Sequence, residues 1–119
     1  MLITLIGAGR VANHLGPVLH KAGHRFGQVF SRTMAHASDL AVVLGAEAVD
    51  VPSAIKPGAD LYLCALSDDA LTTVLNDMVS PRWKHPLLVH TAGSLPLSVL
   101  TPYTNRAGVL YPLQTFSPD

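Results

Sequence analysis

The sequence has very little with which to cross-link itself or to enter a membrane. Its single cysteine, Cys64, excludes an intramolecular disulfide and fits a reducing compartment. No apolar run approaches the roughly 18 residues that a membrane span requires. The apolar start, Met1 to Ile6, lacks the basic region and the length of a secretion signal. These absences lead us to expect a cytoplasmic protein.

Charge is also scarce, and it is balanced. The 119 residues include eight Lys and Arg and eight Asp and Glu, and charged residues make up 13%, roughly half the usual share. Without a basic field, we expect no nucleic-acid partner and no membrane partner. The 49% of hydrophobic residues excludes a disordered chain and suffices for the core of one domain. So few charges predict that another domain or another copy of the chain covers part of the surface.

Short apolar runs alternate with longer segments of helical periodicity along the whole chain. Such alternation is typical of a parallel sheet covered by helices. It predicts the α/β class, with one doubly wound, mostly parallel sheet of about six strands and helices on both faces. The predicted strands are 2–6, 26–31, 47–51, 61–66, 87–91 and 107–111; the predicted helices are 10–22, 35–44 and 67–79, with shorter helical turns at 53–56 and 94–100.

The strongest motif is a glycine-rich turn between the first strand and the first helix. It reads GxGxxA and consists of Gly7, Ala8, Gly9, Arg10, Val11 and Ala12. Gly7 allows a sharp turn, Gly9 lets a pyrophosphate approach the backbone, and Ala12 lets the helix lie close to the sheet. The helix N-terminus adds free N–H groups and partial positive charge. A turn that merely joins strand to helix is the alternative, but its place in a βαβ unit favours a dinucleotide site.

Ser31, Arg32 and Thr33 follow the second predicted strand. A domain that prefers NAD carries an acid here to hold the ribose 2′-hydroxyl, and this chain has no acid between His24 and His36. A guanidinium can instead fork onto a phosphate, and the two hydroxyls add donors. The pattern therefore predicts NADP as the cofactor, with NADPH preferred over NADH. The alternative is a solvated turn with Arg32 at the surface.

The carboxyl ends of the next two strands supply further candidates, because ligands of open α/β sheets bind outside those ends. After the fourth strand, backbone at Leu66 and Ser67 is predicted to line the cofactor, next to Asp68. The same residues also fit an ordinary capped helix start, and the two interpretations are compatible.

After the fifth strand, His90 is a candidate proton donor to a carbonyl or imine. The alternative is a structural histidine that closes the strand. Gly93 and Ser94 are candidate donors to a substrate carboxylate. Tyr111 and Gln114, after the sixth strand, are similar candidates.

No metal site is predicted. His20 and His24 are four residues apart, but Gly23 lies between them and no third ligand is evident. Cys64 lies inside an apolar strand and is expected to be inert core.

Five segments together resemble a known group of proteins: GAGRVA, SRT, ALSDDAL, HTAGS and GVLYPLQTFS, in that order. They resemble the N-terminal Rossmann-like domain of a group of NADP-dependent oxidoreductases that carry a helical C-terminal domain. The group is similar to pyrroline-5-carboxylate reductases and deazaflavin-dependent NADP reductases. More distantly, it is similar to the 6-phosphogluconate and 3-hydroxyisobutyrate dehydrogenases. The likeness covers nearly the whole chain.

The resemblance implies a role for several of these residues. It implies pyrophosphate binding at Gly7, Gly9, Arg10 and Val11, 2′-phosphate binding at Ser31, Arg32 and Thr33, and ribose and nicotinamide contacts around Leu66, Ser67, His90 and Ala92. Ala8, Ala12, Asp68 and Thr91, which adjoin these residues, are also expected to bind the cofactor. We thus expect residues 1–119 to be the NADP-binding domain of an oxidoreductase that acts on a small carbonyl, imine or alcohol. The helical domain of such enzymes, which completes the substrate pocket and the homo-oligomer, is expected beyond residue 119. The alternatives are an NADP-binding sensor without turnover and an assembly domain that binds no nucleotide.

Overall fold

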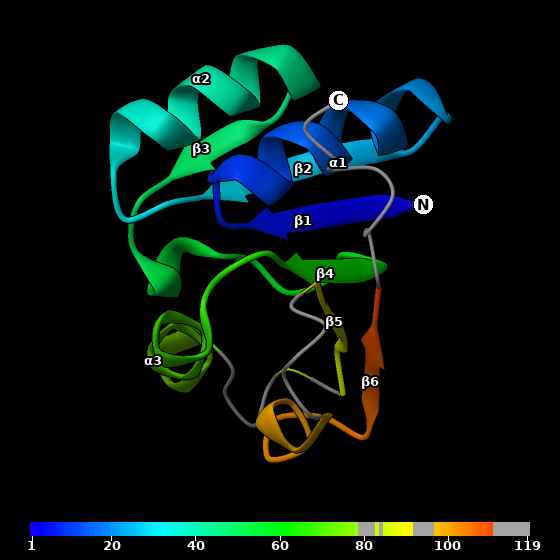
Figure 1. Ribbon diagram of the computed structural model, residues 1–119, viewed down its shortest axis with the longest axis vertical. Helices are drawn as coiled ribbons and strands as arrows, with labels where there is room; N and C mark the ends of the chain where they lie inside the picture. The colour runs from blue at the N-terminus through cyan, green and yellow to red at the C-terminus, as the bar shows by residue number, and fades with distance from the viewer. Residues whose placement is uncertain (79–82, 84, 92–96, 111–119) are drawn as a thin grey trace.

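The computed structural model describes residues 1–78, 83, 85–91 and 97–110. Six parallel strands form one sheet in the order β3-β2-β1-β4-β5-β6 (Figure 1). They are β1 (Leu2–Ile6), β2 (Arg25–Phe30), β3 (Glu47–Val49), β4 (Leu61–Cys64), β5 (Leu87–His90) and β6 (Arg106–Val109). The strand order reverses between β1 and β4, as it does in doubly wound sheets that bind dinucleotides. The predicted fold class is confirmed.

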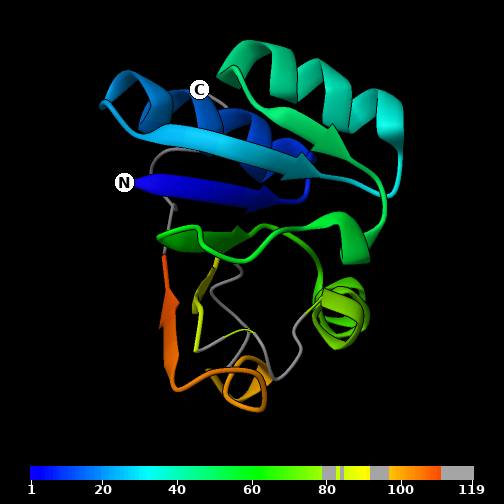
Figure 2. The same cartoon turned by 180° about the vertical axis from the view of Figure 1, so that it is seen from behind.

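Helices cover both faces of this sheet. Helices α1 (Arg10–Lys21) and α2 (Met34–Leu44) lie on one face, and α3 (Asp68–Met78) lies on the other (Figures 1 and 2). Two 3₁₀ turns complete the described elements, η1 (Pro52–Ala54) and η2 (Leu97–Val99). None of the helices in this part of the chain is long and apolar enough to cross a membrane.

Alternation along the strands builds one core on each face. Ile3 and Leu5 of β1 pack with the buried residues of α1 and α2. Ile6 at the end of the same strand packs instead with α3, together with Phe30 of β2. Burial on both faces explains why β1 does not alternate between apolar and polar residues, and Thr4 is its one polar residue. The burial of the end of β1 also sets the point at which the following turn leaves the sheet.

Several predicted boundaries are corrected. β4 ends at Cys64 rather than at residue 66, because its partner β1 ends at Ile6, opposite Cys64. β3 ends at Val49, opposite the last residue of β2, and β6 covers residues 106–109. The helical turns predicted at 53–56 and 94–100 are the short η1 and η2, and residues 94–96 lie outside the described part of the chain.

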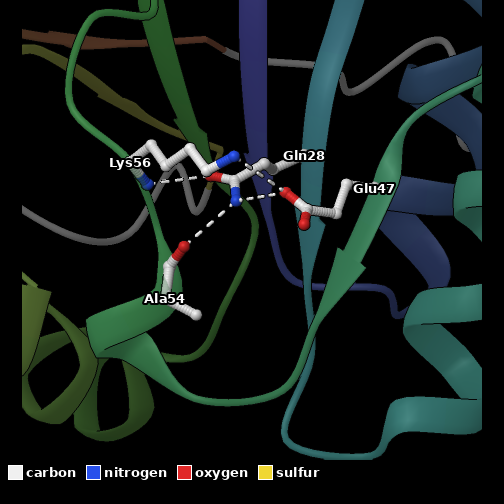
Figure 3. Close-up of polar contacts among 4 residues, drawn as sticks. All are labelled: Gln28, Glu47, Ala54 and Lys56. Carbon is white, nitrogen blue, oxygen red and sulfur yellow. Dashed lines mark hydrogen bonds and ion pairs between the residues drawn. The ribbon is translucent and has the colours of Figure 1, made fainter.

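A buried amide fastens the connection between β3 and β4. Gln28 of β2 is 4% exposed, and its Nε2 donates to the carboxylate of Glu47 at 2.9 Å and to the carbonyl of Ala54 at 3.0 Å (Figure 3). Its Oε1 accepts the backbone N–H of Lys56 at 2.8 Å. The Lys56 ammonium lies 3.6 Å from Glu47 at the surface. Gln28 therefore uses its donors and its acceptor inside the chain, as a buried polar group must.

Candidate functional site

The turn that follows β1 is built around Gly7. Its φ of +118° is a conformation that L side chains rarely adopt, and its N–H donates to the carbonyl of Phe30 at 2.8 Å. A Cβ at this position would lie 2.5 Å from the carbonyl oxygen of Ala65, at the end of β4. Both the backbone conformation and the close approach to β4 therefore require glycine.

Gly9 is a glycine for a different reason. It is the N-cap of α1 with a φ of −87°, and a Cβ added there would meet nothing within 4 Å. Nothing in the described chain therefore requires glycine at this position. The open space lies at the start of α1, where the first N–H groups have no partner within the helix. A Cβ at Gly9 would occupy the space through which a pyrophosphate approaches those groups, so the residues present fit a dinucleotide.

Ala12 lets α1 lie close to the sheet, and Asn13 hydrogen-bonds to the glycine turn before this helix. Ala12 is fully buried against the sheet, as the GxGxxA motif predicts. The Asn13 amide donates to the carbonyls of Ala8 and Gly9 at 2.9 and 2.8 Å. Sequence reasoning missed Asn13. An amide four residues after an N-cap that has no side chain is the signal that points to it.

The segment after β2 presents a cation at the same edge. The Ser31 N–H donates to the carbonyl of Val49 on β3, and the Ser31 hydroxyl accepts the N–H of Thr33 at 3.2 Å. Arg32 is exposed, and its guanidinium has neither an ion pair nor a hydrogen bond within the described part of the chain. Thr33 is the N-cap of α2, but its hydroxyl makes no capping hydrogen bond. Arg32 and Thr33 are thus available to a ligand.

The charge around these two helix starts has one sign. Residues 1–38 contain no Asp or Glu. Of their four Lys and Arg residues, Arg10 and Arg32 lie at the two helix starts, whereas Lys21 and Arg25 lie toward the opposite edge of the sheet. Neither α1 nor α2 has an acid in its first turn. Other segments contribute acids to this edge, with Asp50 after β3 and Asp69 in the first turn of α3. The positive ends of two helix dipoles and two arginines together favour an anion.

The segment after β4 lies against the glycine turn. The Ala65 N–H donates to the carbonyl of Ile6 at 2.8 Å, and Leu66 lies beside Gly7. Ser67 is exposed, and its carbonyl accepts the Leu71 N–H in the first bond of α3. The structure therefore brings Leu66 to the turn, and it confirms that Ser67 precedes a helix.

His90 is the last residue of β5 and is fully buried. It pairs with Cys64 in the sheet, on the face that carries α3. Among the described residues, neither of its ring nitrogens has a hydrogen-bond partner. Thr91, 8% exposed, donates its N–H to the carbonyl of Cys64 at 3.2 Å. The other predicted candidates, Ala92, Gly93, Ser94, Tyr111 and Gln114, lie outside the described residues.

The described residues contain no group of three or more His, Cys, Asp or Glu side chains that could hold a metal ion. Cys64 is buried, and desolvation raises the pKa of its thiol to about 12. A thiol with such a pKa is neutral at physiological pH and is a weak nucleophile.

Two hollows lie at the opposite edge of the sheet. One of about 270 Å³ lies between Tyr62, Trp83 and Arg106, and one of about 500 Å³ lies around Tyr103. Neither is lined by the glycine turn after β1 or by the start of a long helix. Ligands of doubly wound sheets bind at the carboxyl ends of the strands, so we place the site there and not at these two hollows.

Comparison with known families agrees with this geometry. The model of the Rossmann-like domain matches residues 1–115. The chain belongs to the Rossmann-like domain family. The match includes the glycine turn, β2 with its Arg32 segment, and the ends of β4 and β5. No curated protein matches the chain significantly.

Three solved structures show how this Rossmann-like domain compares with whole proteins. A "putative NADP oxidoreductase" from Bacteroides fragilis is 40% identical over 97% of this chain, with a TM-score of 0.89. An imine reductase from Myxococcus stipitatus, solved with NADP+, is 25% identical over 86% of this chain, with a TM-score of 0.69. An imine reductase from Streptomyces aurantiacus is 18% identical over 90% of this chain, with a TM-score of 0.73, and shows the fold alone. The chain spans 45%, 35% and 39% of these proteins respectively.

Proposed function

We propose that this domain binds NADP(H) and forms the cofactor half of an oxidoreductase. The reaction is hydride transfer between nicotinamide and the carbon of a small carbonyl, imine or alcohol substrate. One observation carries the proposal: Gly9 faces open space at a helix N-terminus, and Arg32, which has no partner among the described residues, follows the neighbouring strand. The likeness to an NADP oxidoreductase and to an imine reductase solved with NADP+ supports it.

Each part of the cofactor has a place along the carboxyl edge. The pyrophosphate meets the turn of residues 7–12 and the start of α1. The 2′-phosphate meets Arg32, flanked by Ser31 and Thr33. The ribose and nicotinamide lie over the ends of β4 and β5, near Leu66, Ser67, Asp68, His90, Thr91 and Ala92. Gly93 and Ser94 are proposed to contact the substrate.

The chemistry of hydride transfer belongs to the nicotinamide, which donates or accepts the hydride when bound. The chain's own residues bind and orient it. Arg32 neutralises the 2′-phosphate, and the N–H groups at the start of α1 neutralise the pyrophosphate. His90 and Tyr111 are the candidates for moving a proton to or from the substrate. We further propose that a helical domain completes the substrate pocket and joins two copies of the protein.

Calorimetric titration with NADPH and NADH tests the cofactor assignment. We expect NADPH to bind more tightly than NADH to the wild type, and Arg32→Ala to weaken NADPH roughly 10- to 100-fold with little effect on NADH, because charge-assisted hydrogen bonds are lost. Arg25→Ala is the matched control, since Arg25 is an exposed arginine at the opposite end of the same strand. If the wild type binds neither nucleotide, the proposal is wrong, and an assembly domain without nucleotide becomes the better explanation.

A sensor without turnover is the second candidate function. The observation that favours it is the complete burial of His90, the one acid–base candidate that the structure describes. Both functions require NADPH binding, so only turnover separates them. Oxidation of NADPH, followed by absorbance with a panel of small imines and carbonyls, supports the enzyme. Tight binding without oxidation of NADPH by any member of the panel supports the sensor.

A further inference from the structure

We propose that Asn13 is a positioning residue for the pyrophosphate, and this inference rests on the proposed function. Asn13 lies in the first turns of α1 and is exposed. Its amide donates to the carbonyl of Ala8 at 2.9 Å and to that of Gly9 at 2.8 Å. Through these two bonds a single side chain holds two successive peptide groups of the glycine turn.

Because of the geometry of the peptide group, these two hydrogen bonds also orient the N–H groups of the turn. A trans peptide is planar, and its C=O and N–H point in opposite directions. The Ala8 carbonyl points toward the flank of α1, where Asn13 lies, so the N–H of Gly9 points away from that flank. The Gly9 carbonyl accepts both the N–H and the side-chain amide of Asn13, so the N–H of Arg10 points out of the helix start. Asn13 thereby orients two donors toward the side from which the anion approaches.

Glycine at the N-cap makes this restraint necessary. Gly9 offers no side chain to cap the helix, and glycine is the residue with the most backbone freedom. The turn before it passes through Gly7, whose φ is already positive. Asn13, which lies within the helix, therefore orders the backbone of the glycine turn. Gly9 at the N-cap cannot do so because it has no side chain. Ordering before binding lowers the entropy cost of capturing the phosphates.

The same bonds also affect the electrostatics of the turn. The Ala8 and Gly9 carbonyls carry partial negative charge, and both are occupied by donors from Asn13. A carbonyl that turned toward the pyrophosphate would repel it. An amide is suited to this task because its NH₂ group supplies two donors, whereas a carboxylate of the same shape supplies none.

The test compares two ligands on Asn13→Ala and Asn13→Asp. NADPH contains the pyrophosphate, whereas adenosine 2′-monophosphate contains the 2′-phosphate without it. We expect Asn13→Ala to lower the affinity for NADPH roughly 5- to 20-fold, because it removes about one to two hydrogen bonds that order the turn. Asn13→Asp is expected to lower this affinity further. Adenosine 2′-monophosphate is expected to keep its wild-type affinity. His20→Ala, an exposed change on the same helix, is the matched control.

Each other outcome has a separate meaning. Equal NADPH affinity in wild type and both variants would overturn the role of Asn13 and leave the proposed function intact. Parallel loss of both ligands would also overturn it, because it would show a merely structural role. Failure of the wild type to bind either ligand would reject the proposed function itself. Should Asn13→Ala fail to fold, Asn13→Asp, which keeps the shape of the side chain, decides the question.

Discussion

The two edges of the sheet use their polar groups differently. At the amino edge, the Leu2 N–H donates to the carboxylate of Asp60 at 2.7 Å, and the Tyr62 hydroxyl donates to the Lys56 carbonyl at 2.7 Å. Gln28 satisfies its donors and its acceptor in the same region. At the carboxyl edge, Gly9 faces open space and Arg32 has no partner among the described residues.

This difference separates stability from binding within one small domain. Groups that are satisfied inside the chain contribute to the folded state, and their removal costs free energy of unfolding. Groups left open contribute nothing to folding and are available to an anion. Changes at the amino edge are therefore expected to alter stability and spare affinity, and changes at the carboxyl edge are expected to do the reverse.

Gly9→Asp gives the largest expected effect and separates the two properties most sharply. Aspartate is a good N-cap and is favoured by the helix dipole, so thermal stability is expected to stay constant or rise. Its carboxylate would occupy the space of the pyrophosphate and repel it, and we expect NADPH affinity to fall about 100-fold or more, which is about 2.7 kcal/mol. Calorimetry and thermal melting of the same sample measure both. Retained affinity would show that the phosphates bind elsewhere.

Gln28→Ala is the complementary change at the amino edge. It removes a buried amide that links β2 to Glu47, Ala54 and Lys56, so we expect unfolding to become easier by about 2 kcal/mol. Affinity for NADPH measured well below the melting temperature should not change. Denaturant titration measures the first quantity and calorimetry the second. A large loss of affinity with unchanged stability would contradict the division between the edges.

Glu47 gives the smallest effect, and it depends on pH. The hydrogen bond from Gln28, followed by the charge of Lys56, lowers the pKa of Glu47 below its ordinary value of 4.5. Because the pKa is lower in the folded state, the stabilisation is present above the ordinary value and is lost as pH falls through the lowered one. The difference in free energy of unfolding between wild type and Glu47→Gln should therefore become smaller as the pH falls below 4.5 and through the lowered pKa of Glu47. Chemical denaturation across about pH 3 to 7 measures it, and a constant difference would speak against the shift.

Local sequence pattern predicted much of this fold. The continuous apolar run of β1, the GxGxxA turn and the helical spacing of α1 are each encoded within a few adjacent residues. The alternation of strands and helices then leaves few topologies open, because crossovers between parallel strands are right-handed. For the site, the same local signals pointed to Gly7, Gly9 and Arg32, which follow the carboxyl ends of β1 and β2; their role in binding stays a prediction.

What could not be predicted depends on contacts between distant segments. β4 stops at Cys64 because β1 stops at Ile6, which lies in another part of the sequence. His90 is fully buried at a position where it pairs with Cys64 of β4 and Val109 of β6, and both strands are distant from it in the sequence. Asn13 carries no motif of its own, and its importance appears only once the carbonyls of Ala8 and Gly9 are located.

The contact between Gly7 and Ala65 also bears on the order in which the molecule becomes functional. The first 50 residues contain α1, α2 and the first three strands, yet one wall of the glycine turn comes from the end of β4. During synthesis, the proposed anion site is therefore complete only after β4 has joined β1. A ligand that binds the completed turn also stabilises the pairing of the two halves by mass action. On the proposed function, cofactor binding would therefore stabilise the contact between the half of the sheet that is synthesised first and the half that is synthesised later.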